Sequence, residues 1–372
     1  MRVLFTAVPI HGHLLPLIPL AEAVTAAGDE AAFAVPEALG ALVGRVPVLP
    51  AGPGIEELLA ENDRRTGGAD MADGVEPVAE LFAGTLVDLS FDAALRRGRE
   101  FGAEVVVADE YDPIGPMVAA TLGLPLIRHA VGLPVSPPPL GPAMEARLAP
   151  RYAARGLPRP ARLALVDLWP PVLQAPHWTP PADRLPIRPR LYTGAGPVPP
   201  PPPPPGPGPR VVVTLGTVLL DAGPLDALVD AVAALDTVDV LATVPDGLPR
   251  PLTDPRANVW FVGFVPMAQL LGAGVSVVLA AGGAGTVLAA LTRGIPLVLW
   301  PKGAEKPQNA ERVAAAGAGI VIDDPARAAE AVAKVLSDPS YRAGAERVAE
   351  QIRRAPDADA VWAALSARVR AR

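Results

Sequence analysis

The chain of 372 residues contains no cysteine and only four histidines. Without cysteine, disulfide scaffolds, thiolate metal sites and a cysteine nucleophile are all excluded. The four histidines, His11, His13, His129 and His177, leave little from which to build a metal cluster. We therefore expect a protein that uses neither a metal ion nor a resident cofactor.

The sequence also lacks a strong positive charge and a long apolar segment. Its net charge is -7 and its pI about 5.3, so nucleic-acid binding through a basic surface is not expected. The longest uncharged apolar run, residues 275–291, is interrupted by glycines and is typical of a strand, a loop and a helix rather than a membrane span. No secretory signal pattern is present. We expect a cytoplasmic monomer or homodimer.

Proline is abundant, with 48 residues, and half of the chain is hydrophobic. This length fits two domains with separate cores. The proline-rich run 197–209 favours polyproline II and cannot enter a sheet or helix interior, so it is predicted to be a linker. A proline-rich ligand for a partner domain is the alternative. We predict domains at 1–196 and 210–372, with the last helix able to pack back on the first.

Apolar strands and helical segments alternate in both halves of the chain. Strands are predicted at residues 3–8, 105–108, 124–128, 211–215 and 238–244. Such alternation predicts parallel sheets with helices on both faces, that is, an α/β fold of two Rossmann-like, doubly wound domains. Two segments lack a regular pattern. Residues 59–76 are polar and predicted to be a mobile loop, and residues 130–190 are rich in proline.

The most informative motif is the glycine-rich turn Gly282-Gly283-Ala284-Gly285-Thr286, which follows an apolar strand and opens a helix. Small residues let backbone N–H groups approach an anion, and the helix N-terminus adds a partial positive charge. The predicted ligand is a phosphate or diphosphate.

The segments FVPM, AGGAGTVLAAL and GIPLVLWPKGAEKPQNAERV, in this order, resemble the donor-binding signature of family 1 glycosyltransferases. The similarity is greatest to bacterial enzymes that glycosylate natural products with nucleotide-diphosphate sugars. The N-terminal RVLFTAVPIHGHLLPLIPLAEAV resembles their opening strand and GHxxP loop. The resemblance implies the GT-B fold, with an acceptor-binding and a donor-binding Rossmann-like domain facing across a cleft. It implies inverting, metal-independent transfer from a UDP- or dTDP-sugar to a hydroxyl of a small hydrophobic secondary metabolite.

Two residues carry the chemistry that this resemblance implies. His13, in His13-Leu14-Leu15-Pro16, matches the histidine of GHxxP, and a neutral imidazole suits a general base near neutral pH. Its alternative role is a helix cap. Asp109, at the end of VVVAD, matches by position the aspartate that fixes the tautomer of the base. Asp112 is a rival for that role, and helix capping is the alternative for Asp109.

The resemblance also implies a set of donor-binding residues. Besides the turn at 282–286, they are Gly216, Thr217, Phe264, Val265, Glu305, Lys306 and Asn309. A plain strand-to-helix turn at 216–217 and core packing of Phe264 are the alternatives.

The sequence departs from the family pattern at two places. Ala281 stands where the family usually has a histidine that contacts the diphosphate, and Glu305-Lys306 replaces the usual Asp-Gln pair. These departures favour a catalytically silent homologue that assists an active enzyme, whereas His13, Asp109 and the complete turn favour an active enzyme. A dehydrogenase is disfavoured because no G-x-G-x-x-G follows the first strand. Neither the sugar nor the acceptor can be predicted.

Overall fold

The computed structural model describes residues 1–69, 74–133, 140–195, 206, 208–216, 222–245, 254 and 256–372. The chain divides into two compact units. The first comprises Met1–Leu168, Thr179–Ile187 and Pro356–Arg372, and the second comprises Trp169–Trp178 and Arg188–Ala355. Most of the predicted linker at 197–209 lies outside the described residues.

Six parallel strands form the sheet of the first unit, in the order β2-β1-β3-β4-β5-β6. They are β1 (Arg2–Thr6), β2 (Glu30–Phe33), β3 (Val105–Asp109), β4 (Leu126–His129), β5 (Arg162–Asp167) and β6 (Arg184–Pro186). The predicted strands at 105–108 and 124–128 are confirmed as β3 and β4. Every residue of β3 is buried, as a near-continuous apolar run in a parallel sheet requires.

Helices surround this sheet. They are α1 (His11–Leu14), α2 (Ile18–Ala26), α3 (Gly40–Val43), α4 (Ile55–Thr66), α5 (Val75–Glu80), α6 (Leu86–Phe101), α7 (Ile114–Leu122), α8 (Leu140–Ala154) and α15 (Ala358–Arg370). The loop predicted at 59–76 is wrong over α4. That helix buries Leu58 and Asn62 one turn apart, while Glu61 pairs with Arg64 and Arg65 on its polar side.

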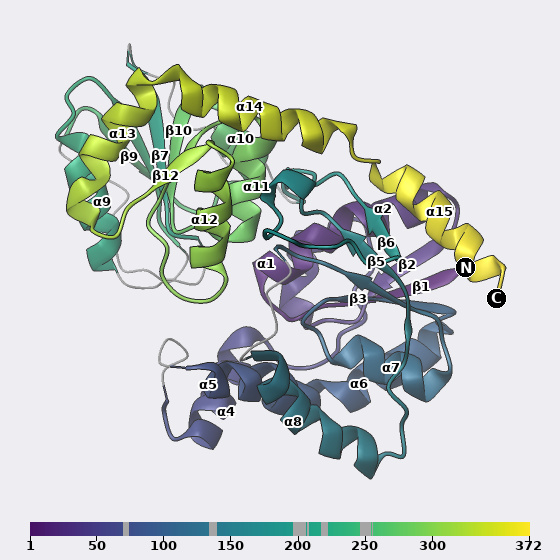
Figure 1. Cartoon of the computed structure of the whole chain (residues 1–372). Helices are drawn as coiled ribbons and strands as arrows, with labels where there is room; N and C mark the ends of the chain where they lie inside the picture. The colour runs from purple at the N-terminus through teal and green to yellow at the C-terminus, as the bar shows by residue number, and fades with distance from the viewer. Residues whose placement is uncertain are drawn as a thin grey trace. The chain divides into compact units, whose positions relative to one another are not determined.

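The last helix, α15, belongs to the first unit and packs against α2 (Figure 1). Trp362 is 1% exposed, and its indole N–H donates to Asp29 Oδ2 at 3.0 Å. The N-terminal ammonium of Met1 donates to the other oxygen of Asp29 at 2.5 Å. Burial raises the pKa of Asp29, but these two hydrogen bonds outweigh burial and leave the pKa below its ordinary value. The N-terminus and the last helix are therefore both bonded to the carboxylate of Asp29.

The second unit also contains a six-stranded parallel sheet, in the order β12-β11-β10-β7-β8-β9. Its strands are β7 (Arg210–Thr214), β8 (Asp239–Thr243), β9 (Val259–Val262), β10 (Val275–Ala280), β11 (Leu297–Leu299) and β12 (Gly319–Val321). Its helices are α9 (Ala222–Ala233), α10 (Met267–Gly272), α11 (Ala284–Thr292), α12 (Lys306–Ala315), α13 (Ala328–Ser337) and α14 (Pro339–Arg354).

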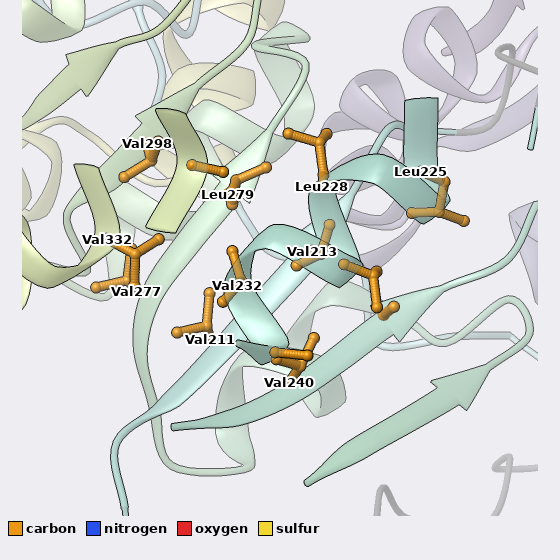
Figure 2. Close-up of a cluster of buried hydrophobic side chains, with 14 of the residues drawn as sticks. Val211, Val213, Leu225, Leu228, Val232, Val240, Val277, Leu279, Val298 and Val332 are labelled. Atoms are coloured by element: carbon orange, nitrogen blue, oxygen red, sulfur yellow. The ribbon is translucent and has the colours of Figure 1, made fainter. Parts of the chain in front are cut away.

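Alternate residues of these strands form one core of the second unit. Figure 2 shows Val213 of β7 and Leu279 of β10 near Leu228 of α9, with Val332 of α13 beside β10. All four side chains are fully buried. Burial of large apolar side chains is worth roughly 1.5–3 kcal/mol each, so it holds the strands in register. The loops that follow the strands of the second sheet therefore begin at well-defined positions along its carboxyl edge.

The two parallel sheets with flanking helices confirm the predicted α/β class with two doubly wound domains. Within the described ranges, no helix has both the length and the hydropathy needed to cross a bilayer.

Candidate active site

Each sheet has one point at which the direction of winding reverses. In the first sheet β1 leads to β2 on one side, and its neighbour β3 leads to β4 on the other. In the second sheet the same holds for the neighbours β7 and β10. Loops diverge at such switch points, and ligands of doubly wound sheets bind there, beyond the carboxyl ends of the strands. The predicted site residues follow these four strands, β11 beside β10, and the edge strand β9.

His13 and Asp109 meet at the switch point of the first sheet. His13 lies in α1 after β1, Asp109 ends β3, and the distance from His13 Nδ1 to Asp109 Oδ1 is 3.1 Å. The carboxylate also accepts the backbone N–H groups of Val8, at 2.8 Å, and Tyr111, at 2.6 Å. Because a carboxylate accepts, Nδ1 of His13 carries the proton and Nε2 is the nitrogen that can take another.

Asp109 remains ionised although its side chain is fully buried. Burial raises its pKa, but the charge and hydrogen bond of His13, together with the two backbone N–H groups, lower the pKa below its ordinary value. A fixed negative charge beside Nδ1 stabilises the imidazolium that forms when Nε2 accepts a proton. The pair can therefore act as an oriented general base.

Asp112, the rival carboxylate, caps a helix. Its two oxygens accept the N–H groups of Ile114, at 2.9 Å, and Gly115, at 3.0 Å, at the start of α7. Burial, followed by the charge of Asp109, raises the pKa of Asp112 to about 6. Of the two carboxylates that the sequence left open, the structure places Asp109 against His13 and gives the capping contacts to Asp112.

Two aromatic rings that sequence reasoning missed lie against His13. The ring centroid of Tyr111 is 5.6 Å from that of His13, with the planes at 76°, and that of Phe82 is 5.8 Å away, at 69°. Tyr111 stands within the segment already singled out for Asp109 and Asp112. Phe82 had no sequence signal, because it lies far from both motifs in the chain.

The glycine-rich turn lies at the switch point of the second sheet. Gly282 has a φ of 90°, and Gly283 is the N-cap of α11 with extended backbone. The first hydrogen bond of the helix runs from the N–H of Val287 to the carbonyl of Gly283. The N–H groups of Ala284, Gly285 and Thr286 precede it, and no described side chain caps this end. These N–H groups are donors of the kind that bind an anion at a helix N-terminus, and the phosphate or diphosphate ligand stays a prediction.

Helix α12 supports this turn from the side. A Cβ at Gly282 would lie 3.3 Å from the carbonyl oxygen of Lys306, so the turn needs glycine both for its positive φ and for this approach. Asn309, fully buried, donates its amide to the carbonyl of Gly282 at 2.9 Å. Of the predicted donor residues, Asn309 thus contacts the turn itself.

The other predicted donor residues follow strands at the same edge of the second sheet. Gly216, with a φ of 84°, comes after β7, and Phe264 and Val265 come after β9. Thr217 lies outside the described residues. Glu305 and Lys306 are half-buried at the start of α12.

Ala281 is a core residue in this structure. Its side chain is 2% exposed and belongs to the same apolar cluster as Leu279 and Trp300. Its N–H is 3.3 Å from the carbonyl of Thr214 in β7. The expectation that residue 281 adjoins the turn at the strand end is met, but its side chain packs within the unit.

Comparison with known proteins identifies the class to which this fold and site belong. Residues 226–367 match the family described as "Erythromycin biosynthesis protein CIII-like, C-terminal domain". The elloramycin glycosyltransferase ElmGT of Streptomyces olivaceus is 31% identical over 376 residues, covering 96% of this chain and 94% of that protein. The L-demethylnoviosyl transferase of Streptomyces niveus is 31% identical over 401 residues, covering 100% and 99%.

Solved structures agree with these relatives. The spinosyn rhamnosyltransferase SpnG has a TM-score of 0.83 at 26% identity, covering 98% of this chain and 100% of its own. The glycosyltransferase SsfS6 of Streptomyces sp. SF2575, complexed with thymidine diphosphate, has a TM-score of 0.82 at 31% identity, covering 98% and 99%. The protein is therefore a transferase with the GT-B fold. It belongs to the bacterial natural-product glycosyltransferases of family 1, which confirms the resemblance seen in the sequence.

Proposed function

We propose that the protein transfers a sugar, with inversion, from a nucleotide-diphosphate sugar to a hydroxyl of a small hydrophobic secondary metabolite. The observation that carries this proposal is the contact between His13 Nδ1 and the buried Asp109. It supplies the oriented base that attack by a hydroxyl requires. Relatives solved with thymidine diphosphate favour a dTDP-sugar over a UDP-sugar as donor.

In the proposed step, Nε2 of His13 takes the proton of the acceptor hydroxyl while its oxygen bonds to the anomeric carbon. The bond from that carbon to the diphosphate breaks on the opposite side, and its electron pair leaves with the nucleotide. Attack opposite to the leaving group inverts the anomeric configuration. Asp109 stabilises the charge that appears on the imidazole, and such general-base catalysis contributes roughly 10²–10⁴-fold in rate.

The leaving diphosphate gains negative charge during this step. We propose that the N–H groups of Ala284, Gly285 and Thr286, with the dipole of α11, stabilise that charge without a metal ion. In the described part of the chain, no three His, Asp or Glu residues are grouped as a metal site would require. Gly216 and Thr217 are proposed to contact the phosphates, Phe264 and Val265 the base, and Glu305 and Lys306 the sugar.

The acceptor class follows from the relatives. SpnG has been solved with spinosyn aglycone, and ElmGT is named for elloramycin. We propose an acceptor of the same kind, an aglycone with a reactive hydroxyl, and a role in secondary metabolism in the cytoplasm.

Calorimetry with thymidine and uridine diphosphates in EDTA, followed by assay of dTDP-sugars with a panel of aglycones, tests this function. We expect binding without added metal, nucleotide release that depends on an aglycone, and a product of inverted configuration by NMR. An absolute requirement for Mg²⁺ or Mn²⁺ contradicts the metal-free step, and retained configuration contradicts inversion. Tight binding with no turnover of any donor favours the silent homologue.

A further inference from the structure

We propose that Phe82 and Tyr111 are positioning residues that fix the plane of the His13 ring, and that the π-helical turn Leu81–Thr85 serves to place Phe82 there. The inference rests on the proposed role of His13 as base and extends it to two side chains and one backbone feature that the sequence motifs do not include.

The hydrogen bond to Asp109 holds Nδ1 of His13, and the bond to Cβ holds Cγ. The imidazole can still leave the carboxylate by rotating about its Cβ–Cγ bond, which carries Nδ1 away from Oδ1 and moves Nε2 with it. The rings of Tyr111 and Phe82 stand at 76° and 69° to the imidazole, with centroids 5.6 and 5.8 Å away. Edge-to-face contacts of this geometry are favourable, and two of them limit the rotation. The direction of Nε2 is thereby set, as efficient proton transfer needs.

The two rings reach His13 by different routes. Tyr111 follows Asp109 by two residues, so one loop supplies both the carboxylate and a ring, with the Tyr111 N–H held by Asp109 Oδ1. Phe82 comes from a separate helical segment that runs from α5 through the π-helical turn into α6. Changes at Phe82 therefore leave the backbone that carries Asp109 untouched.

A π-helical turn inserts one residue into a helix and changes the direction in which its side chains project. Such turns are rare, so this one needs specific support. Asn62 of α4, fully buried, supplies it: its amide donates to the carbonyl of Pro77 at 3.3 Å, and its oxygen accepts from Thr85 Oγ1 at 3.4 Å. Helix α4 thus bonds to the chain on both sides of Phe82.

A second contact fixes the turn from the polar side. The carboxylate of Glu80 accepts from Arg147 of α8 at 2.8 Å and from Arg65 of α4 at 3.3 Å. A Cβ at position 84 would lie 2.1 Å from Glu80 Oε1, so Gly84 leaves the space that this carboxylate occupies. The turn is therefore clamped between α4 and α8, and it carries the ring that contacts His13. Single π-helical turns occur frequently at functional sites.

The scarcity of histidine makes a direct test possible, because ¹⁵N-histidine labelling gives signals from only four rings. Phe82→Leu keeps apolar volume but removes the ring, and Phe82→Tyr keeps the ring. Phe91→Leu is the control, since Phe91 is buried in α6 and stacks under Arg155. We expect Phe82→Leu to move the His13 ¹⁵N resonances toward the average of the two tautomers. We also expect kcat to fall roughly three- to tenfold with KM for the dTDP-sugar unchanged.

Phe82→Tyr is expected to keep the resonances and kcat, whereas Phe91→Leu lowers Tm and changes neither. Gly84→Ala, which displaces Glu80, should move the resonances as Phe82→Leu does. Thr85→Val, which removes the hydroxyl bonded to Asn62, is the milder form of the same test. Unchanged resonances in both turn variants would overturn the role of the turn.

If Phe82→Leu leaves the resonances and kcat unchanged while His13→Ala abolishes transfer, the positioning role is wrong and the proposed function stands. If His13→Ala retains transfer, the proposed function fails. In that case the resonances still decide whether Phe82 orients the ring, because they are measured without substrate.

Discussion

The carboxyl edges of the two sheets present different chemical groups at the same topological position. At the first sheet, His13, Asp109 and Asp112 bring three titratable side chains together, and both carboxylates are fully buried. At the second sheet, the turn from Gly282 to Thr286 contains no charged side chain and presents backbone N–H groups. Moving a proton needs one titratable atom in one place, whereas binding a diphosphate needs several donors with no charge of their own. Side-chain substitutions at the first edge should therefore lower the rate of transfer, whereas changes in backbone conformation at the second edge should weaken nucleotide binding.

The common position results from winding rather than from similar strand order. The strands around the switch point are β2-β1-β3-β4 in the first sheet and β11-β10-β7-β8 in the second. Beyond these four, the first sheet has β5 and β6 on one side only, whereas the second has β12 on one side and β9 on the other. In both strand orders, the loops that follow one pair of neighbouring strands run to opposite sides of the sheet. The pair is β1 and β3 in the first sheet and β7 and β10 in the second. Topology thus fixes where a ligand can bind, and the residues after the strands decide which chemistry occurs there.

The largest effect is expected for His13→Ala. Loss of the base should lower kcat by roughly 10²–10⁴-fold. Affinity for thymidine diphosphate should remain within about twofold, because the donor N–H groups belong to the other unit. Steady-state kinetics and calorimetry on the same preparation check both numbers. A parallel loss of nucleotide affinity would contradict the division of labour between the two edges.

Asp109→Asn and Asp112→Asn separate the two buried carboxylates. Asparagine at 109 removes the charge beside Nδ1 and permits the wrong tautomer, so we expect kcat to fall by about 10²-fold or more. Asparagine at 112 loses one of two capping bonds, which should lower stability by about 1 kcal/mol and change kcat little. Kinetics with parallel thermal unfolding decide the assignment. A larger loss of kcat in Asp112→Asn would reverse the roles.

Gly282→Ala tests the backbone edge. A methyl group at a φ of 90°, 3.3 Å from the Lys306 carbonyl, costs about 1–3 kcal/mol. If that strain moves the turn, affinity for thymidine diphosphate falls by about tenfold or more. Gly272→Ala is the matched control, because a Cβ there meets nothing within 4 Å. Equal affinities for the two variants would show that the turn does not hold the nucleotide.

The pH dependence of stability tests Asp112 without any substrate. Its pKa is raised from 3.8 to about 6 in the folded protein, so protonation favours folding. This contribution is complete below pH 4 and is lost as pH rises through 6. Asp109, whose pKa is lowered, stays ionised over the same range. Relative to Asp112→Asn, the wild type should gain on the order of 1 kcal/mol from pH 8 to pH 5 in denaturant unfolding. A flat difference would contradict the raised pKa.

Short sequence patterns were enough to predict strands such as β3, because each pattern depends on residues that are close together in the chain. The apolar run at 105–108 predicted β3, whereas the partner of His13 came from the family resemblance, which pointed by position to Asp109 and left Asp112 as a rival. Long-range packing left no such signal. The buried residues of helix α4 are Leu58 and Asn62, and only one of them is apolar, so its sequence shows little of the apolar periodicity that predicts a helix. Phe82 reaches His13 only because a π-helical turn, held by Asn62, redirects it.

The smallest effect is expected for Ala281→His, which restores the histidine usual in the family. The sequence alone predicts tighter nucleotide binding, because an imidazole beside Gly282 would add a donor worth about 0.5–1.5 kcal/mol when neutral and up to about 3 kcal/mol when protonated. The structure adds an opposing cost. The Ala281 side chain is 2% exposed among apolar neighbours, and overpacking a core costs about 1–3 kcal/mol.

An imidazole at position 281 has to disturb this packing in order to reach the diphosphate. At neutral pH the packing cost and the gain from a neutral hydrogen bond are therefore of similar size and nearly cancel. We expect Ala281→His to lower Tm by a few degrees and to leave affinity for thymidine diphosphate within about threefold of wild type at pH 8. Below the pKa of the new imidazole its charge favours the diphosphate, so the affinity ratio should rise toward pH 6. Ala281→Leu, which adds volume without a donor, should show the same drop in Tm and no such pH dependence. If the two variants bind alike at every pH, the side chain at 281 does not reach the diphosphate. Histidine could instead tighten binding tenfold at pH 8 with no loss of Tm. In that case the edge of the second sheet accepts a side-chain hydrogen-bond donor as well as backbone N–H groups, and the two edges differ only in degree.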